Sequence, residues 1–593
     1  MKVSRPILTV AASAALAATA NAQNIDWASF DREDSRLVAT NGLGLGDDEE
    51  KDYAWGDFDR DGWIDLIVVR KQPFTTTGRR RNVLFMNLNG TLTDQTAQFA
   101  SASTTVGDEG FLTSTNDRDV AVGDFDGDGW LDFVTATTFS PGQSKVISHP
   151  RVYMNLGENG GVWQGFMFDE ARIPDWGTYP NMCGVAVGDV TGDGAPDIYF
   201  SHYEQQAQVD LNDRLLINDG NGFFTDESSA RMSAAMRGSS FGTSAVIADM
   251  NGDGTQDVIS VSGSGQTGGL TRQSIAYNNE NNEGFFNVLQ TPYTGAPYHV
   301  AVGDLNADGR NDMIISDDAD DRYMINEGND VFGRVQWSAP FTYGGFDDGF
   351  GSNNLIIDLN GDDYAEAVIC DVDVDLSGCG RRMHIYHNRG MVGSQVQLRE
   401  ERQGSNYGAS GLPRLIGTHD VAIFDLDNDG DRDMVVGQCG GTRVYLNQRD
   451  QLGVDYCLDG NPNSSGAVGD LRAIGSPLAA DNDVTLFASD LPNNTFGFFL
   501  ASRERGLIAN PGGSAGNLCL GANIGRYVGP GQIQNSGTIG EIQLGIDLDA
   551  IPQATGPVTA LPGETFHFQA WYRDSVLGQA TSNFTDAVAL TLR

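Results

Sequence analysis

The chain has 593 residues and is strongly acidic, with 80 aspartates and glutamates against 37 lysines and arginines, a formal net charge of −43. Nucleic acids and anionic membranes are bound through basic patches, so this balance excludes nucleic acid as a partner and argues against an anionic membrane surface. The acidic residues are spread along the chain and do not form a tail, which indicates carboxylates with local tasks.

The first 22 residues have the pattern of a secretory signal peptide. Lys2 and Arg5 form a short positive region, residues 7–18 are apolar and rich in alanine, and Ala20-Asn21-Ala22 matches a small-x-small cleavage site. An N-terminal membrane anchor is the alternative, but the apolar run is short for a span of about 20 residues. We therefore expect a mature chain that begins near Gln23, has no membrane span, and is secreted or held at the cell surface.

One pattern recurs seven times within residues 23–450: an apolar strand, an acidic loop of nine residues, and a second apolar strand. Positions 1 and 5 of each loop are Asp, position 3 is Asp, Asn or Thr, and position 9 is Asp or Glu. In chain order these loop residues are Asp57, Asp59, Asp61 and Asp65; Asp124, Asp126, Asp128 and Asp132; Asp189, Thr191, Asp193 and Asp197; Asp249, Asn251, Asp253 and Asp257; Asp304, Asn306, Asp308 and Asp312; Asp358, Asn360, Asp362 and Glu366; and Asp425, Asp427, Asp429 and Asp433.

A second recurring feature is an apolar stretch that ends in asparagine and follows each loop. Several of these asparagines precede a glycine, and both residues tolerate positive φ, so we interpret the site as a hairpin turn. A further apolar strand follows in most units, which gives four short strands per unit. Seven four-stranded units without a helical period predict an all-β fold, a seven-bladed β-propeller. The asparagines are Asn87, Asn155, Asn218, Asn278, Asn326, Asn388 and Asn447.

Two further details bear on how the units meet. Alanine or glycine recurs at fixed positions of the first strand, as at Ala186 and Gly188, which predicts close approach of neighbouring units near the axis. The seventh unit lacks a fourth strand, and residues 27–33 resemble the fourth strands of units two and three. We therefore predict that the N-terminal strand completes the seventh unit and closes the ring.

The acidic loops have the composition of a calcium cage. Side-chain oxygens at positions 1, 3, 5 and 9 and a backbone carbonyl at position 7 supply the six to eight oxygens, at about 2.3–2.6 Å, that Ca²⁺ prefers. Mg²⁺ prefers fewer protein ligands, and Asx turns without metal are the alternative. Carboxylates crowded into one unfilled loop repel each other. We expect up to seven structural Ca²⁺ ions, bound most tightly by the four-carboxylate loops of units one, two and seven.

These units resemble the FG-GAP/VCBS repeats of integrin-α-type seven-bladed propellers, over about residues 24–450. The resemblance rests on the seven loops, on lead-ins such as Val122-Gly123-Asp124, and on the strand-turn-strand partner. It implies that calcium loops join the first and second strands of each blade, on the face opposite the usual ligand-binding face. Members of the family include adhesion proteins, lectin-like modules and some polysaccharide lyases, so the fold does not fix the function.

The C-terminal region, residues 456–593, has no acidic loops. Strand-like runs at 484–487, 496–500, 542–546, 566–572 and 587–592 alternate with Gly, Asn and Pro, which predicts an antiparallel β-sandwich. Carbohydrate binding, surface sorting and simple stabilisation all remain open as its role.

Six cysteines occur, and none forms a CxxC pair, so a cysteine-based zinc site is not expected. Export would permit disulfides. We predict a Cys457–Cys519 bridge and, as a second pair, Cys370–Cys379. Cys183 and Cys439 are then free.

No catalytic signature such as HExxH, GxSxG or a P-loop is present in a suitable context, so no catalytic residue is assigned. Arg118, His299 and His419 stand at the start of first strands, on the predicted face opposite the calcium loops, and form the expected ligand face. The remaining histidines are interpreted mainly as packing or surface residues. The favoured hypothesis is a binding or adhesion protein for an extracellular glycan or protein. The alternative is a polysaccharide-degrading, lyase-like enzyme that uses Arg118 with His299 or His419.

Overall fold

The computed structural model describes residues 27–39, 46, 48–74, 77–177, 180–203, 212–239, 242–263, 272–278, 283–317, 320–342, 353–362, 364–370, 379–392, 395–400, 412, 415–447, 452–457, 461–538, 540–576 and 579–593. The predicted signal peptide, residues 1–22, lies outside the described residues.

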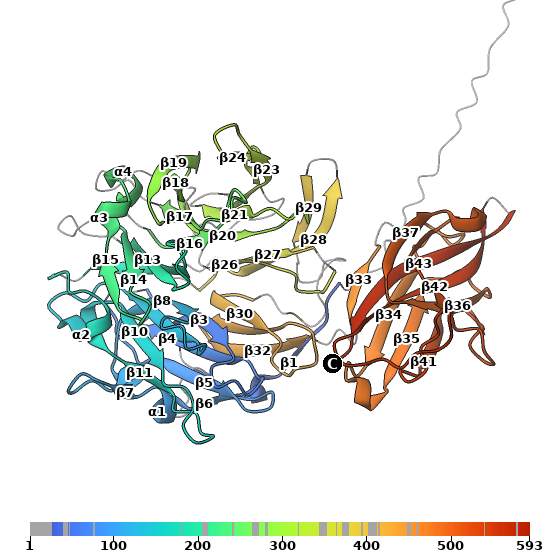
Figure 1. Cartoon of the computed structure of the whole chain (residues 1–593), viewed down its shortest axis with the longest axis horizontal. Helices are drawn as coiled ribbons and strands as arrows, with labels where there is room; N and C mark the ends of the chain where they lie inside the picture. Colours follow the sequence, from blue (N-terminus) through green and yellow to red (C-terminus); the bar gives the residue numbers. More distant parts are fainter. Residues whose placement is uncertain are drawn as a thin grey trace, which may run out of the picture.

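Seven sheets of at least four strands each occupy the repeat region (Figure 1). We number them as units one to seven by their acidic loops. Unit by unit, the strands are β3 (Glu50–Gly56), β4 (Asp65–Lys71), β5 (Val83–Asn87) and β6 (Leu92–Asp94); β8 (Asp117–Gly123), β9 (Asp132–Thr137), β10 (Arg151–Asn155) and β11 (Phe166–Phe168); β12 (Met182–Gly188), β13 (Asp197–His202), β14 (Arg214–Asn218) and β15 (Phe224–Asp226); β16 (Ala245–Ala248), β17 (Asp257–Ser262), β18 (Arg272–Asn278) and β19 (Phe286–Tyr293); β20 (Pro297–Gly303), β21 (Asp312–Asp317), β22 (Arg322–Met324) and β25 (Phe341–Thr342); β26 (Asn354–Ile357), β27 (Glu366–Cys370), β28 (Met383–Val392) and β29 (Gln395–Glu400); and β30 (Thr418–Phe424), β31 (Asp433–Gln438), β32 (Gly441–Asn447) and β1 (Phe30–Arg32).

Each sheet is an antiparallel meander, and each acidic loop joins its first two strands. The sheet of unit seven is completed from the other end of the chain. Strand β1 pairs antiparallel with β32, with Phe30 opposite Asn447 and Arg32 opposite Tyr445. The prediction that the N-terminal strand completes unit seven is therefore confirmed.

Short strands and helices are added to the seven sheets. Strands β2 (Leu37–Val38) and β7 (Ala102–Ser103) add parallel edges to units one and two, and unit five carries a hairpin, β23 (Asn326–Asn329) with β24 (Val335–Trp337). The helices in the described residues are single turns: α1 (Thr96–Phe99), α2 (Lys145–Ser148), α3 (Ser228–Arg231), α4 (Ala234–Arg237), η1 (Asp34–Arg36), η3 (Gly110–Leu112), η4 (Glu170–Arg172), η5 (Ala479–Asp481) and η6 (Pro511–Gly513).

The seven sheets lie around a common centre, with their first strands innermost (Figure 1). Strand β3 contacts β8, and the contacts continue through β12, β16, β20 and β26; β27 then contacts β30, which contacts β3 again. Small residues make this approach possible, as predicted. A Cβ on Gly188 would lie 2.5 Å from the side chain of Ile247 in the next unit. Apolar clusters fill the space between adjacent sheets, as where Val134 of unit two meets Ile198 of unit three.

Strands after unit seven form two larger sheets and a hairpin. The predicted runs all coincide with strands, and the two sheets share one apolar core that includes Leu486, Phe499 and Phe568. The strands are β33 (Val454–Tyr456), β43 (Gln579–Thr591), β42 (Thr565–Val576), β36 (Phe496–Ser502), β39 (Gly525–Arg526) and β40 (Gln534–Asn535) in the first sheet; β34 (Asp470–Gly475), β35 (Val484–Ser489) and β41 (Ile542–Ile546) in the second; and β37 (Arg505–Ala509) with β38 (Asn517–Leu520) in the hairpin.

Two disulfides are present, and one was predicted. The Cys457–Cys519 bridge is confirmed. The predicted Cys370–Cys379 pair is wrong: Cys379 is bonded to Cys439, so Cys439 is not free, and Cys370 keeps a buried thiol, as Cys183 does. Cys370 ends β27 with its side chain in the apolar core, whereas Cys379 lies beside the turn that connects β31 and β32. No helix in the described residues is long and apolar enough to cross a membrane.

Candidate metal centres and central cavity

The carboxylate at position 9 orders every acidic loop through two backbone hydrogen bonds. One oxygen accepts the N–H of loop position 2 at 2.7–3.1 Å, and the other accepts the N–H of the recurring asparagine of the same unit at 2.6–3.3 Å. Burial raises the pKa of these groups, to about 8 for Asp65, Asp132 and Asp433. A nearby cation would favour their ionised form.

The seven asparagines have a role that the turn interpretation missed. None has positive φ; the glycines after them do, as at Gly90 and Gly220. Each asparagine is buried, and its side-chain amide donates to the position 2 carbonyl of the preceding unit's loop at 2.7–3.3 Å. Asn155 reaches Phe58 in this way, and Asn87 of unit one reaches Leu426 of unit seven. These asparagine latches connect the seven loops in a closed cycle.

Loops one, two and seven each leave a buried carboxylate oxygen without a hydrogen-bond donor. These atoms are Oδ1 of Asp57, Asp124 and Asp425 at position 1, and in loop seven also Oδ1 of Asp427. Each loop brings three carboxylate oxygens within 4.8 Å of one another. The three groups are Asp57, Asp59 and Asp61; Asp124, Asp126 and Asp132; and Asp425, Asp427 and Asp433. Buried acceptors without a donor are costly unless a cation binds them, so these residues fit a divalent metal.

Loops three to six satisfy the same oxygen from within the chain. Oδ1 of Asp189 accepts the N–H groups of Gly192 and Asp193 at 2.7 and 3.2 Å, and loops four and six repeat this arrangement. In loop five Asp304 accepts the N–H of Asp308 at 3.0 Å. The asparagine at position 3 of loops four to six donates its amide to the position 5 carboxylate at 2.8–3.1 Å. An amide thus occupies the place of a cation between these side chains.

Two potential ligands were missed from the sequence. Asp431, at position 7 of loop seven, has both carboxylate oxygens buried without a donor, and burial beside Asp429 and Asp433 raises its pKa to about 10. In loop six, His387 lies within 4.8 Å of the carboxylates of Asp362 and Glu366. Each could have been noticed by aligning the units, since the equivalent positions elsewhere carry no acid and no histidine.

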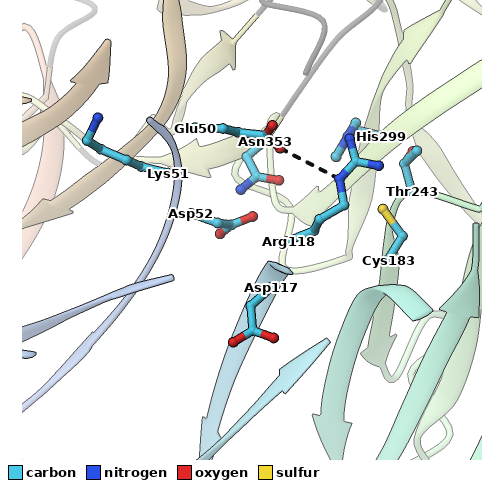
Figure 2. Close-up of a pocket in the computed structure, with 9 residues that line it drawn as sticks. All are labelled: Glu50, Lys51, Asp52, Asp117, Arg118, Cys183, Thr243, His299 and Asn353. Atoms are coloured by element: carbon cyan, nitrogen blue, oxygen red, sulfur yellow. Dashed lines mark ion pairs between the residues drawn. The ribbon is translucent and has the colours of Figure 1, made fainter. Parts of the chain in front are cut away.

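A polar central cavity lies where the first strands of the seven units meet. The residues five positions before the loops line it: Asp52, Asp119, Ser244, His299, Asn353 and Asp420. The cavity consists of two adjoining pockets that share Asp52, His299 and Asn353: a narrow part of ≈ 30 Å³ beside Arg118 and Cys183, with room for about two waters, and a wider part of ≈ 200 Å³. Figure 2 shows the narrow part, with the Arg118 guanidinium beside His299 and the carboxylate of Asp52 opposite.

Three carboxylates of units seven, one and two face this cavity. Asp420 accepts the N–H of Tyr53 at 2.8 Å and Asp119 accepts that of Val185 at 2.7 Å, so each ties its unit to the next. Burial raises the pKa of Asp52 and Asp119 well above the usual range, helped for Asp52 by the charge of Asp420. Burial likewise raises the pKa of Asp420 to about 7. The cavity therefore favours the protonated form of these carboxyl groups more than water does.

The three predicted ligand-face residues do not form one site. Arg118 is 6% exposed; its Nε lies 3.6 Å from Oε1 of Glu50, and its guanidinium stacks over Tyr203. His299 lies beside it, and burial together with the Arg118 charge lowers the pKa of His299 to about 3. His419 is fully buried with Nε2 3.6 Å from Sγ of Cys439, and it is not among the residues that line the narrow part of the cavity.

Comparisons with known proteins identify the repeats. A family model for the FG-GAP-like repeat matches residues 57–135, and one for the FG-GAP repeat matches residues 117–163. The chain is thus an all-β protein with FG-GAP repeats. No curated protein matches the whole sequence. Among solved structures, the biofilm matrix protein Bap1 of V. cholerae is similar at 11% identity and a TM-score of 0.26, over 95% of this chain and 71% of that one. The Tc holotoxin pore of Photorhabdus luminescens is similar at 12% identity and a TM-score of 0.28, over 65% of this chain and 16% of that one.

Proposed function

We propose that this chain is an exported seven-bladed β-propeller, stabilised by calcium, that binds an extracellular glycan or protein. The ring geometry is supported by the contacts between successive first strands and by the asparagine latches, which return from unit one to unit seven. Export is supported by the N-terminal leader pattern and by two disulfides, which persist in oxidising compartments.

The observation that carries the calcium proposal is the set of buried oxygens without a donor in loops one, two and seven. Carboxylate and carbonyl oxygens in a flexible loop suit Ca²⁺, which accepts six to eight of them. Asp57, Asp124 and Asp425 would contribute the atoms that now lack a donor. In the other four loops the position 1 carboxylate accepts backbone N–H groups of its own loop. Loops one, two and seven are therefore the strongest of the seven expected calcium sites.

A binding role is favoured over the lyase alternative by the state of the candidate catalytic groups. Arg118 is buried against Glu50 and Tyr203, and His419 is fully buried. Neither side chain is therefore exposed for contact with a polymer. His299, with a pKa of about 3, is a poor proton acceptor at neutral pH. A central cavity whose arginine is held by Glu50 and whose histidine has a lowered pKa suits a scaffold that presents a surface, and not a site that abstracts protons.

The calcium proposal is tested by melting curves of protein freed of metal by chelation and dialysis. Added Ca²⁺ should raise the melting temperature, since one site filled at a hundredfold excess over Kd contributes about 2.7 kcal/mol. Asp124→Asn should remove the share of that shift that loop two contributes, roughly one of the three strongest sites, whereas Asp249→Asn, in a loop that closes on itself, should leave the shift nearly intact. Identical melting temperatures with and without Ca²⁺ would contradict the proposal.

The binding role is tested by a glycan-array screen in Ca²⁺ and in chelator, run beside an assay for unsaturated products from uronate-containing polysaccharides. Calcium-dependent retention of a glycan without product supports binding. Release of unsaturated sugar that is lost in His299→Ala would favour the lyase alternative instead.

A further inference from the structure

Loop six differs from every other loop because a histidine of the same unit, His387 on β28, lies beside it. His387 stands one residue before the latch residue Asn388, a position that is apolar in the six other units. Those residues are Met86, Met154, Ile217, Tyr277, Ile325 and Leu446. Nε2 of His387 lies 3.8 Å from Oδ2 of Asp362, and one oxygen of Glu366 completes a group of three ligand atoms within 4.8 Å.

The imidazole directs Nε2 toward the loop. The side-chain amide nitrogen of Asn360 donates to Oδ2 of Asp362 at 3.1 Å and lies 3.4 Å from Nε2 of His387, so one N–H group stands between the two ligand atoms. Trp27 stacks on the ring at a centroid distance of 4.6 Å and an interplanar angle of 13°, which fixes the ring plane. A cation between Asp362 and His387 would replace the N–H that now bridges them.

The position 1 carboxylate of loop six is not placed as a calcium ligand would be. Oδ1 of Asp358, at position 1, accepts two N–H groups, those of Gly361 and Asp362, whereas each oxygen of Glu366 accepts one N–H and keeps a lone pair for a cation. The side chains of His387 and Asp362 are 16% and 12% exposed, so an ion can reach them from solvent.

We propose that loop six is a transition-metal site of the Zn²⁺ class, with His387 Nε2 and the carboxylates of Asp362 and Glu366 as protein ligands. Ca²⁺ prefers an all-oxygen shell, whereas imidazole with carboxylates suits Zn²⁺ and its neighbours in the first transition row. Tetrahedral ligands at about 2.0–2.1 Å from zinc lie about 3.3 Å apart, close to the 3.8 Å between Nε2 and Oδ2. This assignment does not depend on calcium in the other loops.

Binding at this site can be measured with Co²⁺, because Co²⁺ binds in zinc sites and absorbs visible light there. Tag-free, metal-stripped protein is titrated with Co²⁺ in excess Ca²⁺. Wild type should bind one Co²⁺ per chain with visible absorption that Zn²⁺ abolishes. His387→Met, which restores the residue of units one and two, should lose that absorption and weaken binding by roughly tenfold or more. Its metal-free melting temperature should match that of wild type.

Two further variants keep the outcome unambiguous. Asp362→Asn retains an acceptor for the N–H of Tyr364 and should also lose Co²⁺ binding. Asp124→Asn, in loop two, should keep Co²⁺ binding while it loses calcium stabilisation, so a failure of the calcium proposal would be visible separately. Absence of Co²⁺ binding by wild type in Ca²⁺, or equal affinity in His387→Met, would overturn the assignment.

Discussion

Single residues divide one repeated loop into two kinds. Where position 3 is Asp, as in Asp59, Asp126 and Asp427, the position 1 carboxylate keeps a buried oxygen without a donor. Where position 3 is Asn, its amide bridges to position 5 and the loop closes without an ion. The count of carboxylates at loop positions 1, 3, 5 and 9, which is visible in the sequence, therefore separates the same units as the hydrogen bonds do.

The pairing of buried acids in the central cavity predicts a pH dependence. Because the pKa values of Asp52 and Asp420 are raised in the folded protein, folding binds protons, and the stability from this pair is full below the ordinary carboxyl pKa of about 4. It is lost as the pH rises through about 7, by up to about 1.4 kcal/mol per pH unit for each proton. Asp52→Asn should flatten this decline, because an amide can donate to Asp420 without charge.

The measurement is the melting temperature between pH 5 and 8 in saturating Ca²⁺, where filled loops stay ionised. Asp119, Arg118 and His299 also face the cavity and are unchanged in this variant. Asp549→Asn, at an exposed site, is the control and should follow wild type. Equal slopes for wild type and Asp52→Asn would contradict the expectation.

At the scale of elements, the strands and the pairing of β1 with unit seven were predictable, whereas the partners of the latch asparagines and of Cys379 were not. Period-two apolar runs and turn residues marked the strands and the completion of unit seven by the N-terminus. The role of the asparagines was missed because Asn155 looks like a turn residue locally, whereas its partner Phe58 is 97 residues away. Cys379 and Cys439 are 60 residues apart and meet only when units six and seven are packed together, so spacing could not reveal the bond.

The N-terminal strand should be essential to unit seven. Deleting residues 23–36 removes β1 and exposes the edge of β32, so we expect a sharp drop in melting temperature, measured by circular dichroism. A milder version is Phe30→Ala, which empties a site that is 1% exposed and should cost about 3–5 kcal/mol. Arg32→Ala, on the same strand but exposed, should cost little. An unchanged melt of the deletion variant would show that unit seven is complete without β1.

In the whole molecule, an asparagine latch crosses each of the seven junctions between neighbouring units. Asn87 makes the junction between the last and first units equivalent to the other six. The position of each asparagine was read from the sequence, but its function depends on the ring, which exists only after all seven units are packed. The assignment that we propose for loop six depends on the fold in a related way, because Trp27 and Asn360 lie beside His387 only in the folded chain.

Removing one asparagine latch should lower the stability of the whole repeat region. Asn87→Ala leaves the buried carbonyl of Leu426 without this donor and should cost about 1–3 kcal/mol. Differential scanning calorimetry should show one repeat-region transition that moves to lower temperature without splitting. Asn221→Ala, in an exposed turn, is the matched control and should melt like wild type. A change confined to unit one, seen as local proteolysis with an unaltered main transition, would show that the junctions act independently.

The pairing of β1 with β32 also sets an order of events during synthesis. Asp34, just after β1, leaves the ribosome 410 residues before its partner Val444 of β32, an interval on the order of 20–80 s at about 5–20 residues per second. The first strand of the fold must therefore wait, unpaired, for the last strand of unit seven. Through that interval Trp27 and Phe30, which are buried in the folded chain, lack the core that unit seven supplies.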